Sequence, residues 1–186
     1  MKRTTSIIAA VAVLATVFVL AAFVRRDDAK PAMTKTDQIV ADWERAKLFT
    51  SEYLDVATDE LVTFKPTEEI RTFGQQMLHL AEANYGLTAG ATGKTSPVPF
   101  GSLEKSDQYK TQAALKKAVM DSYDFAIAAA KEMNDQKLAE TTKIFNFEMT
   151  REVALNKAFE HQTHHRGQST VYIRLKGIKP PNEKLF

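Results

Sequence analysis

The segment Thr150–Pro181 decides the fold, and it reads TREVALNKAFEHQTHHRGQSTVYIRLKGIKPP. Thr150 belongs to the residue types that favour a helix N-cap, and the acidic Glu152 after it suits the first turn of a helix. Gly177 is typical of the position just past a helix C-terminus, and the two prolines that follow prevent the helix from continuing. The segment therefore predicts a long helix over residues 150–176.

Two histidines of this predicted helix, His161 and His165, are four residues apart. At about 100° of rotation per residue, they lie on one face of the helix, about one turn apart along its axis. Ala154 and Tyr172 share that face, whereas the opposite side carries mostly polar residues. We therefore expect both imidazoles to point into the core, while His164 lies at the edge of this face and points away from the shared site.

Three further segments have the apolar periodicity of helices, the first after Thr36 and the second after Thr67 as N-caps. Residues 138–149 are expected to be irregular or briefly extended. The chain has only seven glycines and six prolines, which favours helices over a fold with many turns. The sequence therefore predicts an all-α four-helix bundle. The predicted helices are residues 37–56, 68–87, 111–133 and 150–176.

The first 26 residues form a separate segment. Two basic residues precede an uncharged, mostly apolar run over residues 7–24, and two arginines follow it. This pattern is typical of a secretory signal peptide, which we prefer, or of an uncleaved N-terminal membrane anchor. Residues 27–35 predict a polar linker, and residues 36–186 the folded domain. We therefore expect an exported protein, either periplasmic or membrane-anchored and facing outside the cytoplasm.

Composition excludes several classes of site and partner. The chain has no cysteine, so a disulfide, a thiolate metal site and a cysteine nucleophile are all ruled out. The whole chain has a net charge of +2, but residues 1–26 contain four basic and no acidic residues. The remainder has 21 basic and 23 acidic residues, a net charge of −2. A mildly acidic domain has no general attraction for nucleic acid, which we therefore do not expect as a partner.

Two imidazole rings that lie side by side in a protein core need a partner that stabilises them there. Two protonated rings would repel each other in a low dielectric, whereas a metal ion binds both in their neutral form. A further ligand would come from another helix, and His79, within the second predicted helix, is the only histidine left. These residues favour one divalent metal ion bound by His79, His161 and His165, with the loop 88–106 as a candidate cover. The alternative is ordinary core packing or a hydrogen-bonded polar network.

The motif from His161 to Gln168, His-x-x-x-His-Arg-Gly-Gln, is accompanied by related stretches at residues 61–66, 71–74 and 77–82. On these residues the chain resembles the DinB-like (damage-inducible) family over residues 36–181. The resemblance implies a four-helix bundle with up-down-down-up topology and one metal ion held by three histidines.

Carried onto this sequence, the ligands that the resemblance implies are His79, His161 and His165. The metal in the family is typically zinc, nickel or another first-row divalent ion. Family members are often homodimers, which makes a homodimer an expectation here.

Three neutral histidines leave coordination positions for water or a substrate, which is the layout of a catalytic rather than a closed structural site. We therefore expect a metal-dependent hydrolase or transferase acting on a small molecule. Hydrolysis is favoured, because the low-molecular-weight thiols that a thiol-dependent transferase needs are scarce outside the cytoplasm. No general base stands beside the motif, so the catalytic residues stay unassigned. A non-enzymatic metal-binding or structural module is the alternative.

Residues near the expected ligands have weaker patterns. Gln168 and Tyr172 share the ligand face and are candidates for orienting water or substrate, although a glutamine there more often bonds a neighbouring helix. Glu82, one turn after the first expected ligand, is a candidate acceptor for an imidazole N–H, or else an exposed carboxylate. Arg166 is expected to pair with an acid or a helix end, and Gly167 to permit close helix packing.

Overall fold

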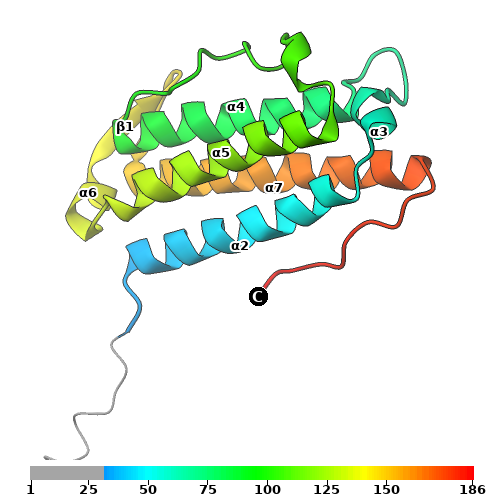
Figure 1. The fold of residues 1–186 in the computed structure, drawn as a ribbon. Coiled ribbons are helices and arrows are strands. Elements are labelled where there is room, and N and C mark those ends of the chain that lie inside the picture. The colour runs from blue at the N-terminus through cyan, green and yellow to red at the C-terminus, as the bar shows by residue number, and fades with distance from the viewer. Residues whose placement is uncertain (1–31) are drawn as a thin grey trace, which may run out of the picture. The chain divides into compact units, whose positions relative to one another are not determined.

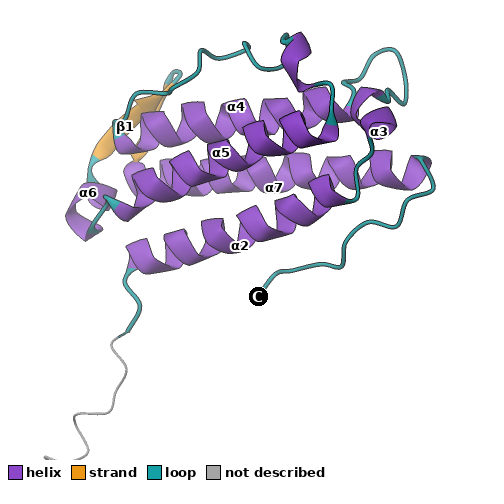
Figure 2. Ribbon diagram, viewed as in Figure 1, coloured by secondary structure: helices purple, strands orange, loops and turns teal. Residues whose placement is uncertain are grey.

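Four long helices form the body of the domain in the computed structural model, which describes residues 32–186 (Figure 1). They are α2 (Lys35–Asp55), α4 (Phe73–Thr92), α5 (Gln112–Lys131) and α7 (Arg151–Leu175). Short elements connect them: α3 (Asp59–Thr63), η1 (Asp107–Tyr109), α6 (Asp135–Ala139), β1 (Thr141–Ile144) and β2 (Phe147–Thr150). Figure 2 shows that the two strands are confined to a single hairpin.

The predictions for the N-terminal segment concern residues outside this description. The signal peptide or anchor at 1–26 and most of the linker at 27–35 lie before residue 32. Between residues 32 and 186, no helix is long and apolar enough to span a membrane.

The contacts between helices give their order around the bundle. Helix α4 packs against both α5 and α7, and α2 packs against α5 and less extensively against α7. Helices α4 and α5 run in the same direction, because residues 93–111 return along the length of the bundle before α5 begins (Figure 1). The bundle therefore has the up-down-down-up topology that the family resemblance implied.

Helix α4 begins five residues later than the sequence analysis predicted. Its N-cap is Thr72 rather than Thr67: the Thr72 hydroxyl accepts the N–H of Gln75, and the Gln75 side chain accepts the N–H of Thr72. The same reciprocal arrangement joins Thr34 and Asp37 at the start of α2. The N-cap of α2 is therefore Thr34, two residues before the predicted cap, Thr36. This capping box satisfies two backbone N–H groups instead of one, which favours these threonines over their neighbours.

Helix α4 also ends later than predicted, at Thr92 instead of Leu87. Gly93 ends it with a φ of 76°, in the left-handed region that glycine adopts without strain. Gly90 lies inside the helix, where the hairpin packs on it: a Cβ at this position would lie 3.4 Å from the Ile144 side chain. Gly90 therefore lies within α4 rather than in the predicted loop 88–106, and it allows the close contact with the hairpin.

The other boundaries agree more closely with the sequence. Thr111 and Thr150 are the N-caps of α5 and α7, and Gly177 follows α7 with a φ of 72°. Residues 138–149 complete α6 and form most of the antiparallel hairpin, in which Thr141 lies opposite Thr150. The brief extended structure that we predicted there is thus present.

Buried apolar side chains form a large core between the four long helices and a smaller one on which the hairpin packs. Trp43 is 1% exposed in the large core, and its ring meets those of Tyr123 and Phe159 edge to face at 5.8 and 5.6 Å between centroids. The smaller core consists of Ala91, Met133, Leu138, Ala154 and Leu155.

The close approach of α3 to α4 depends on Gly74. A Cβ added there would lie 2.9 Å from the carbonyl oxygen of Val62 and 3.0 Å from its Cγ1. We expect Gly74→Ala to lower the free energy of unfolding by about 1–3 kcal/mol, because the backbone must shift. Denaturant unfolding of the full chain measures this change.

The matched control is Gly167→Ala, in the middle of α7. A Cβ at Gly167 meets no atom within 4 Å, so the better helix propensity of alanine should raise stability by about 0.5–1 kcal/mol. Equal effects at the two glycines would contradict the close contact at Gly74.

Candidate metal centre

Three histidines meet at the seam between α4 and α7. His79 comes from α4, and His161 and His165 come from successive turns of α7. One nitrogen of each ring lies within 4.8 Å of the others. The ring centroids are 4.3 to 5.2 Å apart. The structure thus brings all three expected ligands together, whereas the exposed His164 lies outside this group, with its ring against that of His165.

The surroundings keep two of these rings neutral. Burial and the neighbouring histidines lower the pKa of His161 to about 4 and that of His165 to about 3. At neutral pH each ring therefore keeps a nitrogen lone pair, which is the form that binds a metal. The Nδ1 of His161 is also buried, and it has no hydrogen-bond partner among the described residues. A metal ion would satisfy such a nitrogen, so the donor set fits one.

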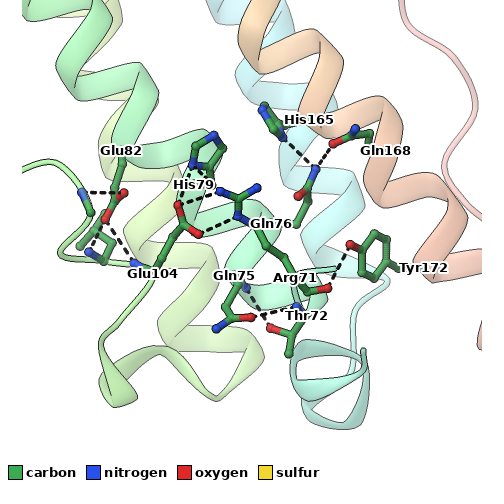
Figure 3. A network of polar contacts seen from close by, with 12 residues as sticks. Arg71, Thr72, Gln75, Gln76, His79, Glu82, Glu104, His165, Gln168 and Tyr172 are labelled. Atoms are coloured by element: carbon green, nitrogen blue, oxygen red, sulfur yellow. Dashed lines mark hydrogen bonds and ion pairs between the residues drawn. The ribbon is translucent and has the colours of Figure 1, made fainter. Parts of the chain in front are cut away.

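A carboxylate holds His79 (Figure 3). Glu104 Oε1 lies 2.6 Å from His79 Nδ1, and Arg71 Nε donates to Glu104 Oε2 at 2.7 Å. Burial would raise the pKa of Glu104, but the hydrogen bonds from Arg71 and His79 outweigh it and lower that pKa. When Nδ1 carries the ring proton, His79 donates it to this carboxylate, and the lone pair of Nε2 is then free for a metal ion. Metal-binding histidines are commonly oriented in this way.

An amide group supports His165 from the other side. The side-chain nitrogen of Gln76 lies 2.8 Å from His165 Nδ1 and also contacts the amide oxygen of Gln168 (Figure 3). An amide can turn by 180° with little change in shape. With both amides turned, Gln168 donates to Gln76 Oε1, which in turn accepts the Nδ1 proton of His165. In that arrangement His165 Nε2 is free for a metal.

A sequence model of the DinB family matches residues 33–185. The chain belongs to the DinB family. Among its relatives is YrdA of Bacillus subtilis, which is 29% identical over 151 residues that cover 78% of this chain and 85% of YrdA. YjoA of the same organism is 22% identical over 148 residues, covering 78% of this chain and 93% of YjoA.

Two solved structures share the fold. A DinB-like protein from Bacillus cereus has a TM-score of 0.64 at 24% identity, covering 78% of this chain and 95% of that one. YfiT from Bacillus subtilis has a TM-score of 0.62 at 17% identity, covering 82% and 94%. YfiT is described as a probable metal-dependent hydrolase with an unusual four-helix bundle topology. The predicted family and the four-helix bundle are therefore confirmed.

In this DinB domain Glu82 fastens the loop that carries Glu104. Glu82 is 1% exposed, and its carboxylate accepts the backbone N–H groups of Gly101, Leu103 and Glu104. It lies near His79 as well, within a second group of potential metal donors that includes Glu104. Because its oxygens are already occupied by the loop, Glu82 is neither the imidazole partner nor the exposed carboxylate that we expected.

Other neighbours of the histidines also differ from expectation. Tyr172 donates its hydroxyl proton to the Arg71 carbonyl at 3.0 Å, so it positions the residue that binds Glu104. Arg166 pairs with no acid among the described residues, and a Cβ at Gly167 would meet no atom of another helix. The expectations for Arg166 and Gly167 were therefore wrong.

Arg71, Gln76 and Glu104 were not predicted as parts of the site. A signal existed for Gln76, because it lies three residues before His79 and so on the same side of α4. Glu104 lies in the long loop, where no periodicity tells which side chain turns inward. Arg71 precedes the cap of α4, and its backbone position depends on the distant Tyr172.

Proposed function

We propose that this DinB domain binds one divalent metal ion through His79, His161 and His165. The donor set carries the proposal, because three imidazoles converge and the pKa values of two of them are strongly lowered. Glu104 and Gln76 orient two of the rings from behind, and the third has a buried nitrogen without a partner in the described chain. Imidazole donors suit zinc, nickel and similar first-row ions, which remain our proposal for the metal.

We further propose that the site hydrolyses a small molecule, with group transfer as a second form of the same chemistry. A divalent ion with three protein ligands lowers the pKa of a bound water and polarises a substrate carbonyl. Glu104 keeps the His79 ring in place, and the guanidinium of Arg71, whose side chain is 40% exposed, supplies positive charge for a developing oxyanion. The shared fold with YfiT supports this proposal.

The surroundings of Glu104 favour one alternative, a non-enzymatic metal-binding module. This carboxylate is already engaged by both Arg71 and His79, so the site has no obvious free base to take a proton from water. In that role the ion would join α4 to α7 and stabilise the bundle.

Export and dimerisation also belong to the proposal. The apolar run within residues 1–26 supports work outside the cytoplasm, either after cleavage of a signal peptide or on an anchor. The net charge of −2 beyond residue 26 supports a small-molecule substrate over nucleic acid. A homodimer is proposed from the family resemblance alone.

A measurement of substrate turnover distinguishes a hydrolase from a non-enzymatic metal-binding module. We expect the full chain, loaded with zinc or nickel, to hydrolyse at least one member of a panel of activated esters and amides with saturable kinetics. His165→Ala should abolish this turnover, whereas His164→Ala, on the adjacent exposed position, should retain it. An absence of turnover across the panel, with the metal demonstrably bound, would leave the non-enzymatic module as the better reading.

A further inference from the structure

A groove lies on the side of the bundle formed by α2, α7 and the C-terminal residues after Gly177. Its volume is about 550 Å³, and none of the three clustered histidines lines it. Two contacts hold the C-terminal segment against α2: Arg45 donates to the Lys184 carbonyl at 2.8 Å, and the Lys184 ammonium lies 2.7 Å from Glu52. The apolar part of its lining comes from Phe49, Tyr53, Pro180, Pro181 and Leu185.

The groove contains a buried cation that lacks a counter-charge. Arg166 is 4% exposed, and no carboxylate of residues 32–186 lies within ion-pair distance of it. Its Nη1 donates to Gln162 Oε1 at 2.8 Å and to Thr50 Oγ1 at 3.4 Å. The guanidinium carbon lies 4.6 Å from the centroid of the Phe49 ring. Burying a charge without an opposite charge is unfavourable, so this arginine is poorly explained by the fold alone.

One edge of the guanidinium remains available. Within residues 32–186, the hydrogen bonds of Arg166 are donated by Nη1, and none is donated by Nε or Nη2. The Arg166 side chain lines the groove. The Nε–Nη2 edge is the geometry that binds a carboxylate through two parallel hydrogen bonds.

The rest of the lining adds positive charge and hydroxyl groups. Arg174 and Lys179 are exposed and form no ion pair within residues 32–186, whereas Glu183 is the only carboxylate among the lining residues. The groove thus has an excess of two positive charges on a domain whose net charge is −2. Thr163 and Thr170 supply hydroxyl groups beside it.

We propose that this groove binds a small organic carboxylate. The carboxylate group contacts the free edge of Arg166, Arg174 and Lys179 attract it, and the apolar body of the ligand packs between Tyr53 and Pro180. The apolar walls favour an organic carboxylate over inorganic phosphate. None of the proposed metal ligands lines this groove, so carboxylate binding can be tested independently of metal binding and hydrolysis.

Calorimetric titration of the full chain with 2-naphthoate tests the proposal, and the neutral 2-naphthamide is the ligand control. We expect saturable binding of one naphthoate per chain and no measurable binding of the amide. Arg174→Gln/Lys179→Gln should weaken naphthoate binding about three- to tenfold. Arg166→Lys keeps the charge but removes the planar fork, and should weaken binding by about tenfold or more.

Charge-matched controls make the result specific. Lys94→Gln/Lys143→Gln removes two positive charges from residues that do not line the groove and should leave naphthoate binding unchanged. Metal content should be the same in every variant. The proposal is overturned if naphthoate and naphthamide bind alike, if neither binds, if inorganic phosphate binds more tightly than naphthoate, or if the control variant weakens binding as much as the groove variant.

Discussion

Elemental analysis of the full chain, purified without added metal, is expected to find about one zinc or nickel ion per wild-type chain and almost none in His161→Ala. The effect should be this large because the substitution removes one of only three protein ligands. It also removes the buried Nδ1 that has no other partner in the described chain. The remaining pair, His79 and His165, would hold a divalent ion too weakly to survive purification.

His164→Ala is the matched control for this measurement. It removes a histidine from the same stretch of α7, but its ring lies outside the converging group. Metal content should therefore stay at the wild-type level. If neither the wild type nor either variant contains metal, even after reconstitution with zinc and nickel, the three histidines form a polar network in the core, and hydrolysis by this site is excluded with it.

Glu82→Gln is expected to lower both the stability of the domain and its affinity for metal. Two backbone N–H groups now reach Glu82 Oε1 and one reaches Oε2, and an amide can serve only one of these two sets. A buried donor that loses its acceptor costs about 1–3 kcal/mol, which corresponds to a fall of about 2–12 °C in the melting temperature of a domain of this size. Thermal unfolding of the metal-free chain measures this change.

The affinity for metal should fall in the same variant for an indirect reason. Releasing the loop displaces Glu104, which holds His79, and loss of such a supporting group commonly costs about 10- to 100-fold in metal affinity. Glu104→Gln is the comparison, because it should weaken metal binding while leaving the Glu82 contacts and the melting temperature of the metal-free chain nearly unchanged. A Glu82→Gln variant with unaltered stability would show that Glu82 does not fasten the loop.

The parts of the molecule that sequence predicted well are those set by local chemistry. The periodicity of α7, its cap at Thr150 and the glycine at position 177 are all properties of a continuous segment, and the helix ends at Leu175. The inward direction of His161 and His165 follows from the same helical phase. Gln76 could have been predicted in this way too, since it shares a side of α4 with His79.

The parts that sequence could not predict depend on contacts between distant segments. Thr72 rather than Thr67 starts α4, and the Arg71 carbonyl just before this cap is held by Tyr172, about 100 positions away. Glu82 was placed near the histidines correctly, but its partners lie about 20 residues further on, in a loop without periodicity. Arg166 was expected to pair with an acid or a helix end, and only the packing of α2 and the C-terminal segment around it shows that it is buried.

The connection between the end of α4 and the start of α5 is longer than it needs to be to return along the bundle. Helix α4 has 20 residues and is about 30 Å long, a distance that a fully extended chain covers in about nine residues. Residues 93–111 number 19, so about half of the residues in this connection are not needed to span that distance. The extra length lets the connection bring Glu104 to His79. A deletion that merely shortens the connection could therefore preserve the order of the helices and still remove the carboxylate from the site.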